Sequence, residues 1–536
     1  MKRFVRANSR RGLLAAALLG ALAGPLCAQT LTVGLKGEPM SLDPAFRAIT
    51  TDMVVARHIF EPLVTSDADM KLKPALATEW KLVEPTAWVF KLRPGVKFSD
   101  GTPFTADDVV FSFERALKVP NSPSPMSIFA RGIQRVKAVD PLTVRIETDA
   151  PNPSLPRALE RLMIMSKKSA SGPAPEGKTT AQLNGGDGLV GTGPFVYVSW
   201  TRGAEIALAR NPLYWGEPVH WQKVVLRFVT NPAARISALL SGGIDIIEDP
   251  TPDDLPRLLK DPQVKVSSAP TTRLVYIGLD TAAPKFAGLD ANPLKDVRVR
   301  RALALAIDRK VLGERIMEDV GLPTAGTIAP MMEGGSAAAR LPAADVAGAK
   351  KLLQEAGYPN GFTMTLGAPN GRYINDAKVA QAVASMWGRA GVKVSLDTPT
   401  TAIFFKNLVA YDYPSHITGW ADLVSTDRMR ALFATRGGKP SDGATNYERY
   451  SNRELDALIE RASSTLDEAE RIALVRKIEK TAVEDDVAVI PLHFEKTAMA
   501  MRKGLSYATR ADQIYMSQYV RAAGAAVAER GTDRSK

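Results

Sequence analysis

The chain has little of the side-chain chemistry on which metal sites and cysteine-based enzymes depend. Its 536 residues include one cysteine and four histidines. The histidines lie far apart without the spacing of metal ligands, at His58, His220, His416 and His493. We therefore expect no metal site and no cofactor.

The N-terminal segment has the composition of an export signal. An apolar run from Gly12 to Leu26 follows five basic residues, Lys2, Arg3, Arg6, Arg10 and Arg11. We expect residues 1–28 to be a signal peptide cleaved near Ala28. The only cysteine, Cys27, would be lost with it, which excludes a disulfide or a cysteine nucleophile in the mature chain. The pair Arg10 and Arg11 leaves open whether export uses the general or the twin-arginine route.

The remaining chain lacks other marks of membrane or nucleic-acid association. No later apolar stretch reaches the ~20 residues needed to span a bilayer. The net charge of +12 falls to +7 without the signal peptide, and no block of Lys and Arg alternates with aromatic residues, so nucleic-acid binding is not expected.

The mature chain exceeds the roughly 250 to 300 residues that one hydrophobic core serves, which predicts two or three domains.

Motifs of known catalytic sites are also missing. The glycine-rich stretch GDGLVGTGP, residues 186–194, lacks the Gly-Lys-Ser/Thr ending of a phosphate loop, and a strand pattern follows it. The chain has no Gly-x-Ser-x-Gly nucleophile elbow. We expect no catalytic residue and no enzyme activity.

What the sequence does contain is an alternation of strand and helix patterns. Residues 86–98 alternate like a strand, and a helix follows, for which Asp107 or Asp108 is the expected cap. Helical patterns also cover residues 298–317, 345–357 and 376–391. Residues 166–192 are rich in Gly, Pro and small polar side chains and are predicted to be a loop. The succession of helices and strands predicts an α/β fold.

Several stretches resemble family 5 extracellular solute-binding proteins, the dipeptide- and oligopeptide-binding components of ABC importers. The similar segments keep the family's order along nearly the whole mature chain. They include GEPMSLDPAF from Gly37, WVFKLRPGVKFSDGTPFTADDVVFSFERAL from Trp88, GTGPFVYVSW from Gly191, VRVRRALALAIDR from Val297 and AKKLLQEAGYPNGF from Ala349.

The resemblance implies a periplasmic binding-protein fold, with two α/β lobes joined by a hinge and an extra small domain inserted in the N-terminal lobe. Carried onto this chain, the family's division gives lobe I, an inserted domain, lobe II and a disordered tail. These are residues 29–70 with 192–282 and 495–525, residues 71–191, residues 283–494, and residues 526–536, respectively.

One end of the ligand site is implied by the stretch GWADLVSTD, residues 419–427. In peptide binders of the family, an acid shortly after a Gly-Trp pair binds the ligand's ammonium group. Trp420 offers a flat apolar face, and Asp422 and Asp427 are the candidate acids. The family's acid stands three residues after the tryptophan, where this chain has Leu423. The alternative is that Trp420 packs in the lobe and both acids cap the following helix.

The other end is implied by Arg372 and Tyr373, which precede a helix at the loop where dipeptide binders carry an arginine for the ligand carboxylate. A guanidinium can donate two parallel hydrogen bonds to a carboxylate. The alternative is a surface arginine paired with Asp376. Phe46 follows the Leu-Asp-Pro turn in a segment that faces the cleft in the family.

The resemblance therefore predicts a monomeric periplasmic protein that binds small peptides between its lobes. It would deliver them to an inner-membrane ABC permease with cytoplasmic ATPase subunits. Two alternatives remain: import of a non-peptide solute, such as glutathione, an opine, a sugar or a metal chelate, and presentation of a ligand to a chemoreceptor.

Overall fold

The structure, a computed structural model, describes residues 30–123, 125–130, 132–286, 288–336, 341–439 and 441–522. The expected signal peptide, residues 1–28, and the expected tail, residues 526–536, lie outside the described residues. Among the helices of the described ranges, none combines the length and the apolar composition that crossing a membrane requires.

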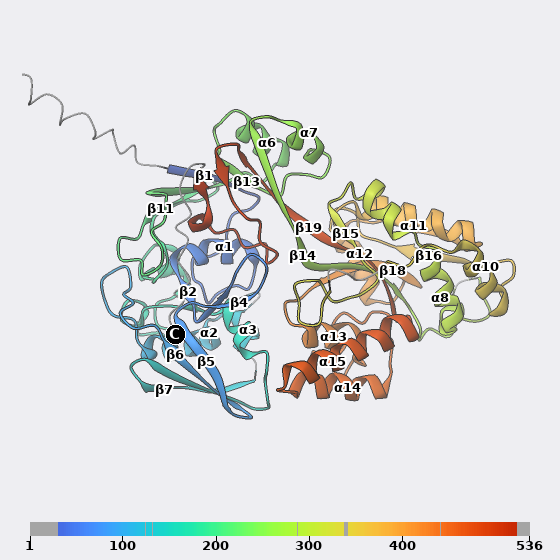
Figure 1. The fold of residues 1–536 in the computed structure, drawn as a ribbon, viewed down its shortest axis with the longest axis horizontal. Helices are drawn as coiled ribbons and strands as arrows, with labels where there is room; N and C mark the ends of the chain where they lie inside the picture. Colours follow the sequence, from blue (N-terminus) through green and yellow to red (C-terminus); the bar gives the residue numbers. More distant parts are fainter. Residues whose placement is uncertain are drawn as a thin grey trace, which may run out of the picture.

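Two halves of the molecule are joined by two long antiparallel strands, β14 (Val264–Leu279) and β19 (Val489–Arg502) (Figure 1). The outer part of β14, residues 264–270, pairs with residues 496–502 of β19 in the first half. The inner part, residues 274–278, pairs with residues 489–494 in the second half. The register shifts between Pro270 and Leu274, so the crossover lies at residues 271–273, opposite Glu495.

One sheet continues through both halves in the order β10-β11-β12-β1-β13-β19-β14-β18-β16-β17, and β15 pairs with β19. In the first half, which we call lobe I, a core of buried aliphatic and aromatic side chains includes Leu31, Val33, Phe60 and Val520. Its elements are β1 (Thr30–Leu35), α1 (Thr50–Ile59), α4 (Lys167–Ala170), α5 (Thr180–Asn184), β10 (Phe195–Thr201), β11 (Glu205–Arg210), β12 (Lys223–Phe228), α6 (Pro232–Leu240), β13 (Ile246–Glu248), α7 (Leu255–Lys260), β20 (Leu505–Ser506) and β21 (Arg521–Ala522).

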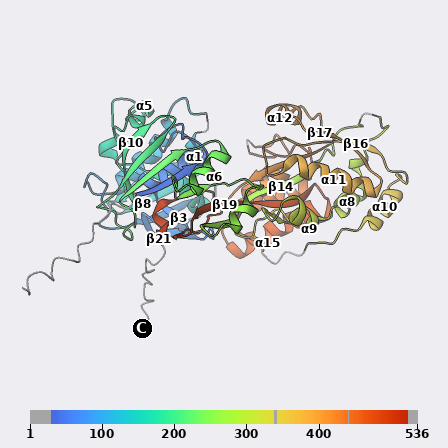
Figure 2. The same ribbon diagram turned by 90° about the horizontal axis from the view of Figure 1, so that it is seen from above.

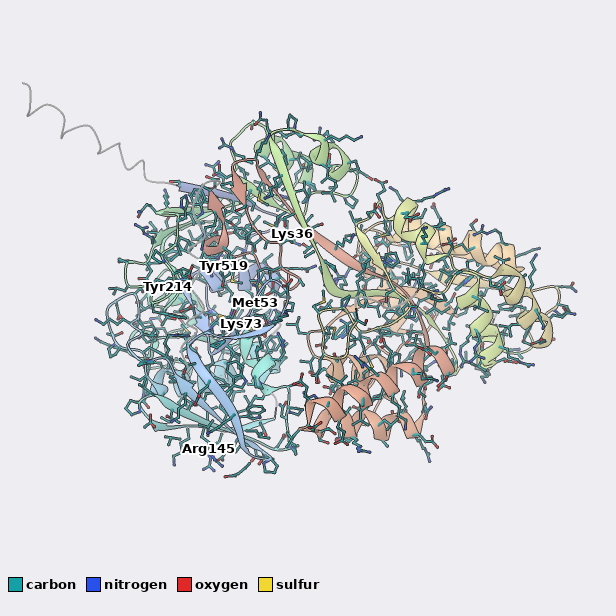
Figure 3. All side chains as sticks on the ribbon, in the orientation of Figure 1. Lys36, Met53, Lys73, Arg145, Tyr214 and Tyr519 are labelled. Carbon is teal, nitrogen blue, oxygen red and sulfur yellow. The ribbon has the colours of Figure 1, made fainter. Side chains whose placement is uncertain are left out.

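A smaller domain is inserted between α1 and β10 and has its own four-stranded antiparallel sheet, in the order β5-β6-β8-β7. Its elements are β2 (Glu61–Pro62), β3 (Val64–Ser66), β4 (Leu72–Pro74), β5 (Ala77–Glu84), β6 (Ala87–Leu92), α2 (Ala106–Lys118), β7 (Ile133–Asp140), β8 (Thr143–Thr148), α3 (Leu155–Ala158) and β9 (Met163–Ile164). In Figure 3, Lys36 lies beside the crossover strands and Arg145 lies at the far end of this inserted domain.

The inserted domain is tied to lobe I by a fully buried ion pair. Arg115 of α2 donates two hydrogen bonds, of 2.6 and 2.7 Å, to the carboxylate of Asp43 in the loop after β1. The two side chains are 1% and 0% exposed. A bidentate contact fixes both distance and orientation, so the inserted domain and lobe I are held as one unit.

The second half, lobe II, places helices against the other end of the long sheet. Its elements are α8 (Val297–Leu305), α9 (Arg309–Val311), β15 (Gly321–Pro323), α10 (Val346–Glu355), β16 (Thr363–Gly367), α11 (Asp376–Ala390), β17 (Lys393–Asp397), α12 (Thr401–Val409), β18 (Ser415–Ala421), α13 (Ser425–Phe433), α14 (Arg453–Ser464) and α15 (Glu468–Glu479). Seen from above, the two lobes lie on opposite sides of β14 and β19 (Figure 2). The fold is therefore the expected pair of α/β lobes.

The sequence-based domain limits remain a prediction. The crossover of β14 lies at residues 271–273, within the segment that the prediction assigns to lobe I, whereas the crossover of β19 at Glu495 adjoins the predicted limit.

Local details differ from the sequence prediction where a competing contact is stronger. Helix α2 begins after Thr105, and Asp108 completes the capping box from the third helical position, so neither Asp107 nor Asp108 is the cap itself. The predicted helix over residues 298–317 is broken after α8, because Asp308 caps a new helical segment by accepting the Val311 N–H. The predicted loop at residues 166–192 contains the short helices α4 and α5.

Candidate functional site

The candidate ligand residues of lobe II come together at one edge of the sheet. Strands β16 and β18 are parallel neighbours, with Leu366 opposite Ser415 and Gly367 opposite His416. Arg372 and Tyr373 lie in the loop that follows β16, and Trp420 lies at the end of β18. The carboxyl ends of parallel strands meet at the same edge, which is where open α/β sheets hold their ligands.

A side-chain contact joins the two segments. The hydroxyl of Tyr373, which is 6% exposed, donates to the carbonyl oxygen of Gly419 at 3.2 Å. A Cβ atom at position 419 would lie 2.8 Å from the carbonyl oxygen of Leu274 and 3.0 Å from Cε1 of Tyr373. The glycine before Trp420 is thus required by the close approach of the Tyr373 ring and strand β14, and Tyr373 links the Arg372 loop to the end of β18.

The Arg372 loop is fixed through its backbone. The buried carboxylate of Asp376 accepts the N–H groups of Gly371, Arg372 and Tyr373 at 3.2, 2.8 and 3.0 Å. The alternative of a side-chain pair between Arg372 and Asp376 is therefore not the arrangement found. The guanidinium of Arg372 is exposed and lies 5.4 Å from the Tyr373 ring centre, and it forms no ion pair with any side chain in the described ranges.

Glu495 connects this loop to the crossover. Its carboxylate accepts the N–H of Ile374 at 2.9 Å and lies 3.4 Å from Nε of Arg273 on β14. Burial raises the pKa of Glu495, while Ile374, Arg273 and Arg372 act in the opposite direction. The position of Arg372 is thereby coupled to the strands about which the lobes can turn.

The two candidate acids lie near each other after β18. Burial raises the pKa of Asp422, whose carboxylate accepts the Val424 N–H at 3.1 Å. Asp427 is in the first turn of α13 and keeps an exposed side-chain surface, yet the protein around its carboxyl group and the charge of Asp422 raise its pKa to about 7. For both acids, burial therefore outweighs the positive charge nearby.

Two arginines act against this rise in pKa, Arg428 on Asp422 and Arg430 on Asp427, but they do not reverse it. Arg428 is completely buried and donates to the backbone oxygens of Thr327, Thr272 and Asp422. Burial lowers the pKa of Arg428 to about 10. Its role is to hold α13 against the crossover strand.

Phe46 is separate from the other five candidates. It is half-buried in lobe I, where its N–H donates to the Asp43 oxygen at 3.1 Å and its carbonyl oxygen accepts from Ser122. The contacts of the described residues do not join it to Arg372, Tyr373, Trp420 or either acid.

A cavity of about 410 Å³ lies between the inserted domain and lobe II. Its walls include Trp80, Leu82 and Trp88 on one side and Met332 and Leu423 on the other. Sequence reasoning identified only Leu423, as a departure from the family pattern. The alternation in residues 86–98 predicts a strand, but it cannot tell which face of that strand meets another lobe.

The described residues contain no group of three or more His, Cys, Asp or Glu side chains arranged to hold a metal ion. His58, for example, is a buried structural residue whose Nδ1 and Nε2 pair with the Val54 oxygen at 2.7 Å and with Ser517 at 2.8 Å.

Comparisons with a family model and with known proteins agree on one family. The model described as "Bacterial extracellular solute-binding proteins, family 5 Middle" matches residues 71–441. The oligopeptide-binding protein OppA of Bacillus subtilis (strain 168) is 27% identical over 498 residues, covering 87% of each chain.

Two solved structures represent different states of similar proteins. The unliganded open form of the murein tripeptide-binding protein MppA is 26% identical, with a TM-score of 0.77 over 92% of this chain and 97% of that one. AgaA from A. tumefaciens R10, in complex with agropinic acid, is also 26% identical, with a TM-score of 0.66 over 92% and 98% of the two chains.

Proposed function

The chain belongs to the family 5 bacterial extracellular solute-binding proteins, and from that premise we propose that it binds small peptides between its lobes. The observation that carries the proposal is the charge arrangement at the carboxyl edge of β16 and β18. A guanidinium without an ion-pair partner among the described side chains, Arg372, shares this edge with two acids of raised pKa, Asp422 and Asp427. A peptide has the complementary charges, a carboxylate and an ammonium group.

Binding would proceed by closure of the lobes. The better fit to the unliganded open form of MppA than to the AgaA complex supports an open state for the present structure. A ligand that contacts both lobes favours the closed state by the difference between its affinities for the two states. Backbone hydrogen bonds to an extended peptide would tolerate varied side chains, while the end charges set its register.

The chain is a family 5 solute-binding protein, and we infer that its partner is an ABC permease with ATPase subunits. We infer that it acts as a monomer in the periplasm after cleavage near Ala28, and that the bound solute leaves chemically unchanged.

A non-peptide anion is the second candidate for the ligand. Leu423 stands where the family's ammonium-binding acid is expected, and the AgaA structure shows a similar protein with agropinic acid bound. Such a ligand would use Arg372 and leave the two acids without a cationic partner.

Substitution of Arg372 tests the carboxylate end of the site. Calorimetric titration with Ala-Ala-Ala should show that Arg372→Ala weakens binding by roughly tenfold to a hundredfold, because a charged hydrogen bond is lost. Arg372→Lys should recover only part of the affinity that Arg372→Ala loses, since lysine cannot donate two parallel hydrogen bonds from a planar group.

Two controls define the result. Asn370→Ala, an exposed change in the same loop, should bind as the wild type does, and the C-terminal amide of Ala-Ala-Ala should bind wild type and Arg372→Ala equally. Unchanged affinity of Arg372→Ala for the free acid would refute the assignment.

A further inference from the structure

The cavity between the inserted domain and lobe II has an aromatic wall that the fold leaves uncovered. Trp80 and Leu82 on β5 lie opposite Phe90 and Trp88 on β6, so the four residues share one face of the sheet. Phe90 is completely buried in the core of the inserted domain, whereas Trp80, Leu82 and Trp88 are half-buried and line the cavity. The inner face of this sheet therefore continues beyond its own core and faces lobe II.

One of the two indole N–H groups of this wall is already hydrogen-bonded within the inserted domain. The indole N–H of Trp88 donates to the carbonyl oxygen of Asn152 at 3.1 Å. The ring can thus present its apolar surface to a ligand without leaving a donor unpaired.

Part of the opposite wall is apolar and adaptable, although Thr272, Glu333, Ser425, Glu468 and Arg471 also line it. Met331, Met332, Leu423 and Val424 of lobe II line the cavity. Methionine side chains are unbranched and polarisable, so they adjust to groups of different shape and make favourable contacts with aromatic rings. Leu423 and Val424 directly follow Asp422, which places this wall next to the proposed ammonium site.

The arginines of the lining bring no unpaired charge into the cavity. Arg157 is 2.6 Å from Glu160, and Arg471 is 2.8 Å from Glu333. The remaining acid, Glu468, is exposed in the first turn of α15. A volume of about 410 Å³ lies within the range of roughly 300 to 1,000 Å³ that is usual for small-molecule sites.

We propose that this cavity is a specificity pocket for a bulky apolar side chain, preferably aromatic, on the peptide residue nearest the ammonium terminus. The inference rests on the proposed function, because the pocket opens beside the proposed ligand site. It also gives a reason for Leu423: an acid at that position would place a charge in the apolar wall.

The test compares Ala-Ala-Ala with Phe-Ala-Ala, Ala-Phe-Ala and Ala-Ala-Phe by calorimetry. Wild type should bind Phe-Ala-Ala at least about tenfold more tightly than Ala-Ala-Ala, since burying several apolar groups separates ligands by this order. Leu423→Asp should abolish that ratio, whereas Leu423→Met, which keeps an apolar wall, should retain it within about twofold.

A second pair of variants tests the inserted domain. Leu82→Ala should reduce the ratio several-fold, and Val83→Ala, a neighbouring exposed residue outside the lining, should leave it unchanged. An equal loss of affinity for both peptides in Leu423→Asp and Leu82→Ala would mean that the two walls serve lobe closure, which would overturn the pocket. If the ratio of affinities for Phe-Ala-Ala and Ala-Ala-Ala is unchanged in both variants, the pocket is overturned as well.

The neutral fluorophore N-phenyl-1-naphthylamine separates failure of the pocket from failure of the proposed function. If wild type binds no peptide but binds the fluorophore, and Leu423→Asp loses it while Leu423→Met does not, the peptide proposal fails and the pocket stands. Equal fluorophore binding by Leu423→Asp and wild type would overturn the pocket.

Discussion

At the scale of single residues, the proposed site depends on side chains that position the Arg372 loop. Asp376 holds the backbone of the Arg372 loop, and Tyr373 joins that loop to Gly419. Arg372 is thus free to use its guanidinium for a ligand, because the backbone that carries it is positioned by other groups.

The raised pKa of Asp427 predicts a pH-dependent affinity. An ammonium group binds the ionised carboxylate, so binding removes a proton from an acid whose pKa is about 7 in the free protein. The affinity for Ala-Ala-Ala should therefore fall by about tenfold or more between pH 7.5 and pH 5.5, as the carboxyl group becomes protonated. The measurement is calorimetry across this range.

Asp427→Asn is the matched variant for this titration. It should bind more weakly than wild type at pH 7.5 and show little change down to pH 5.5. The same pH dependence in the variant and the wild type would exclude Asp427 as the group that meets the ammonium.

At the scale of elements, the crossover strand β19 carries a buried histidine that responds to acid. His493 is 1% exposed, and neither ring nitrogen has a hydrogen-bond partner among the described residues. Burial lowers its pKa from 6.5 to about 4. The folded state therefore excludes a proton that the unfolded chain accepts, so this group does not affect stability well above pH 6.5 and lowers it increasingly as the pH falls from 6.5 toward 4.

His493→Leu should remove this sensitivity. Between pH 7.5 and pH 4, urea unfolding should show that the variant loses about 3 kcal/mol less stability than wild type, because it lacks the histidine whose pKa burial lowers to about 4. Losses that are equal in the two proteins would show that His493 does not titrate with folding.

The elements also show how far sequence reasoning reaches. Helix α11 is predicted by the helical spacing of its apolar residues, and its end is predicted by Gly391. In the structure Gly391 has φ of +105°, a conformation that favours glycine. The break after α8 and the uncovered face of β5 do not follow, because each depends on contacts made in three dimensions. For the same reason the sequence places Arg372 and Trp420 in separate segments, and only the parallel pairing of β16 and β18 brings them to one edge.

At the scale of the whole molecule, the inserted domain and lobe I act together. The buried pair of Asp43 and Arg115 fixes the insert to lobe I, while lobe II is reached through β14 and β19. Closure would therefore bring two surfaces toward lobe II at once, the cleft side of lobe I and the aromatic wall of the insert. A ligand that spans both would be selected by its end charges and by one apolar group.

The most direct measurement of the central claim is native mass spectrometry of protein expressed in the periplasm, followed by release and identification of the bound material. We predict a mixture of short peptides, enriched in bulky apolar residues at the N-terminus. A single non-peptide compound carried by the purified protein would contradict the peptide assignment.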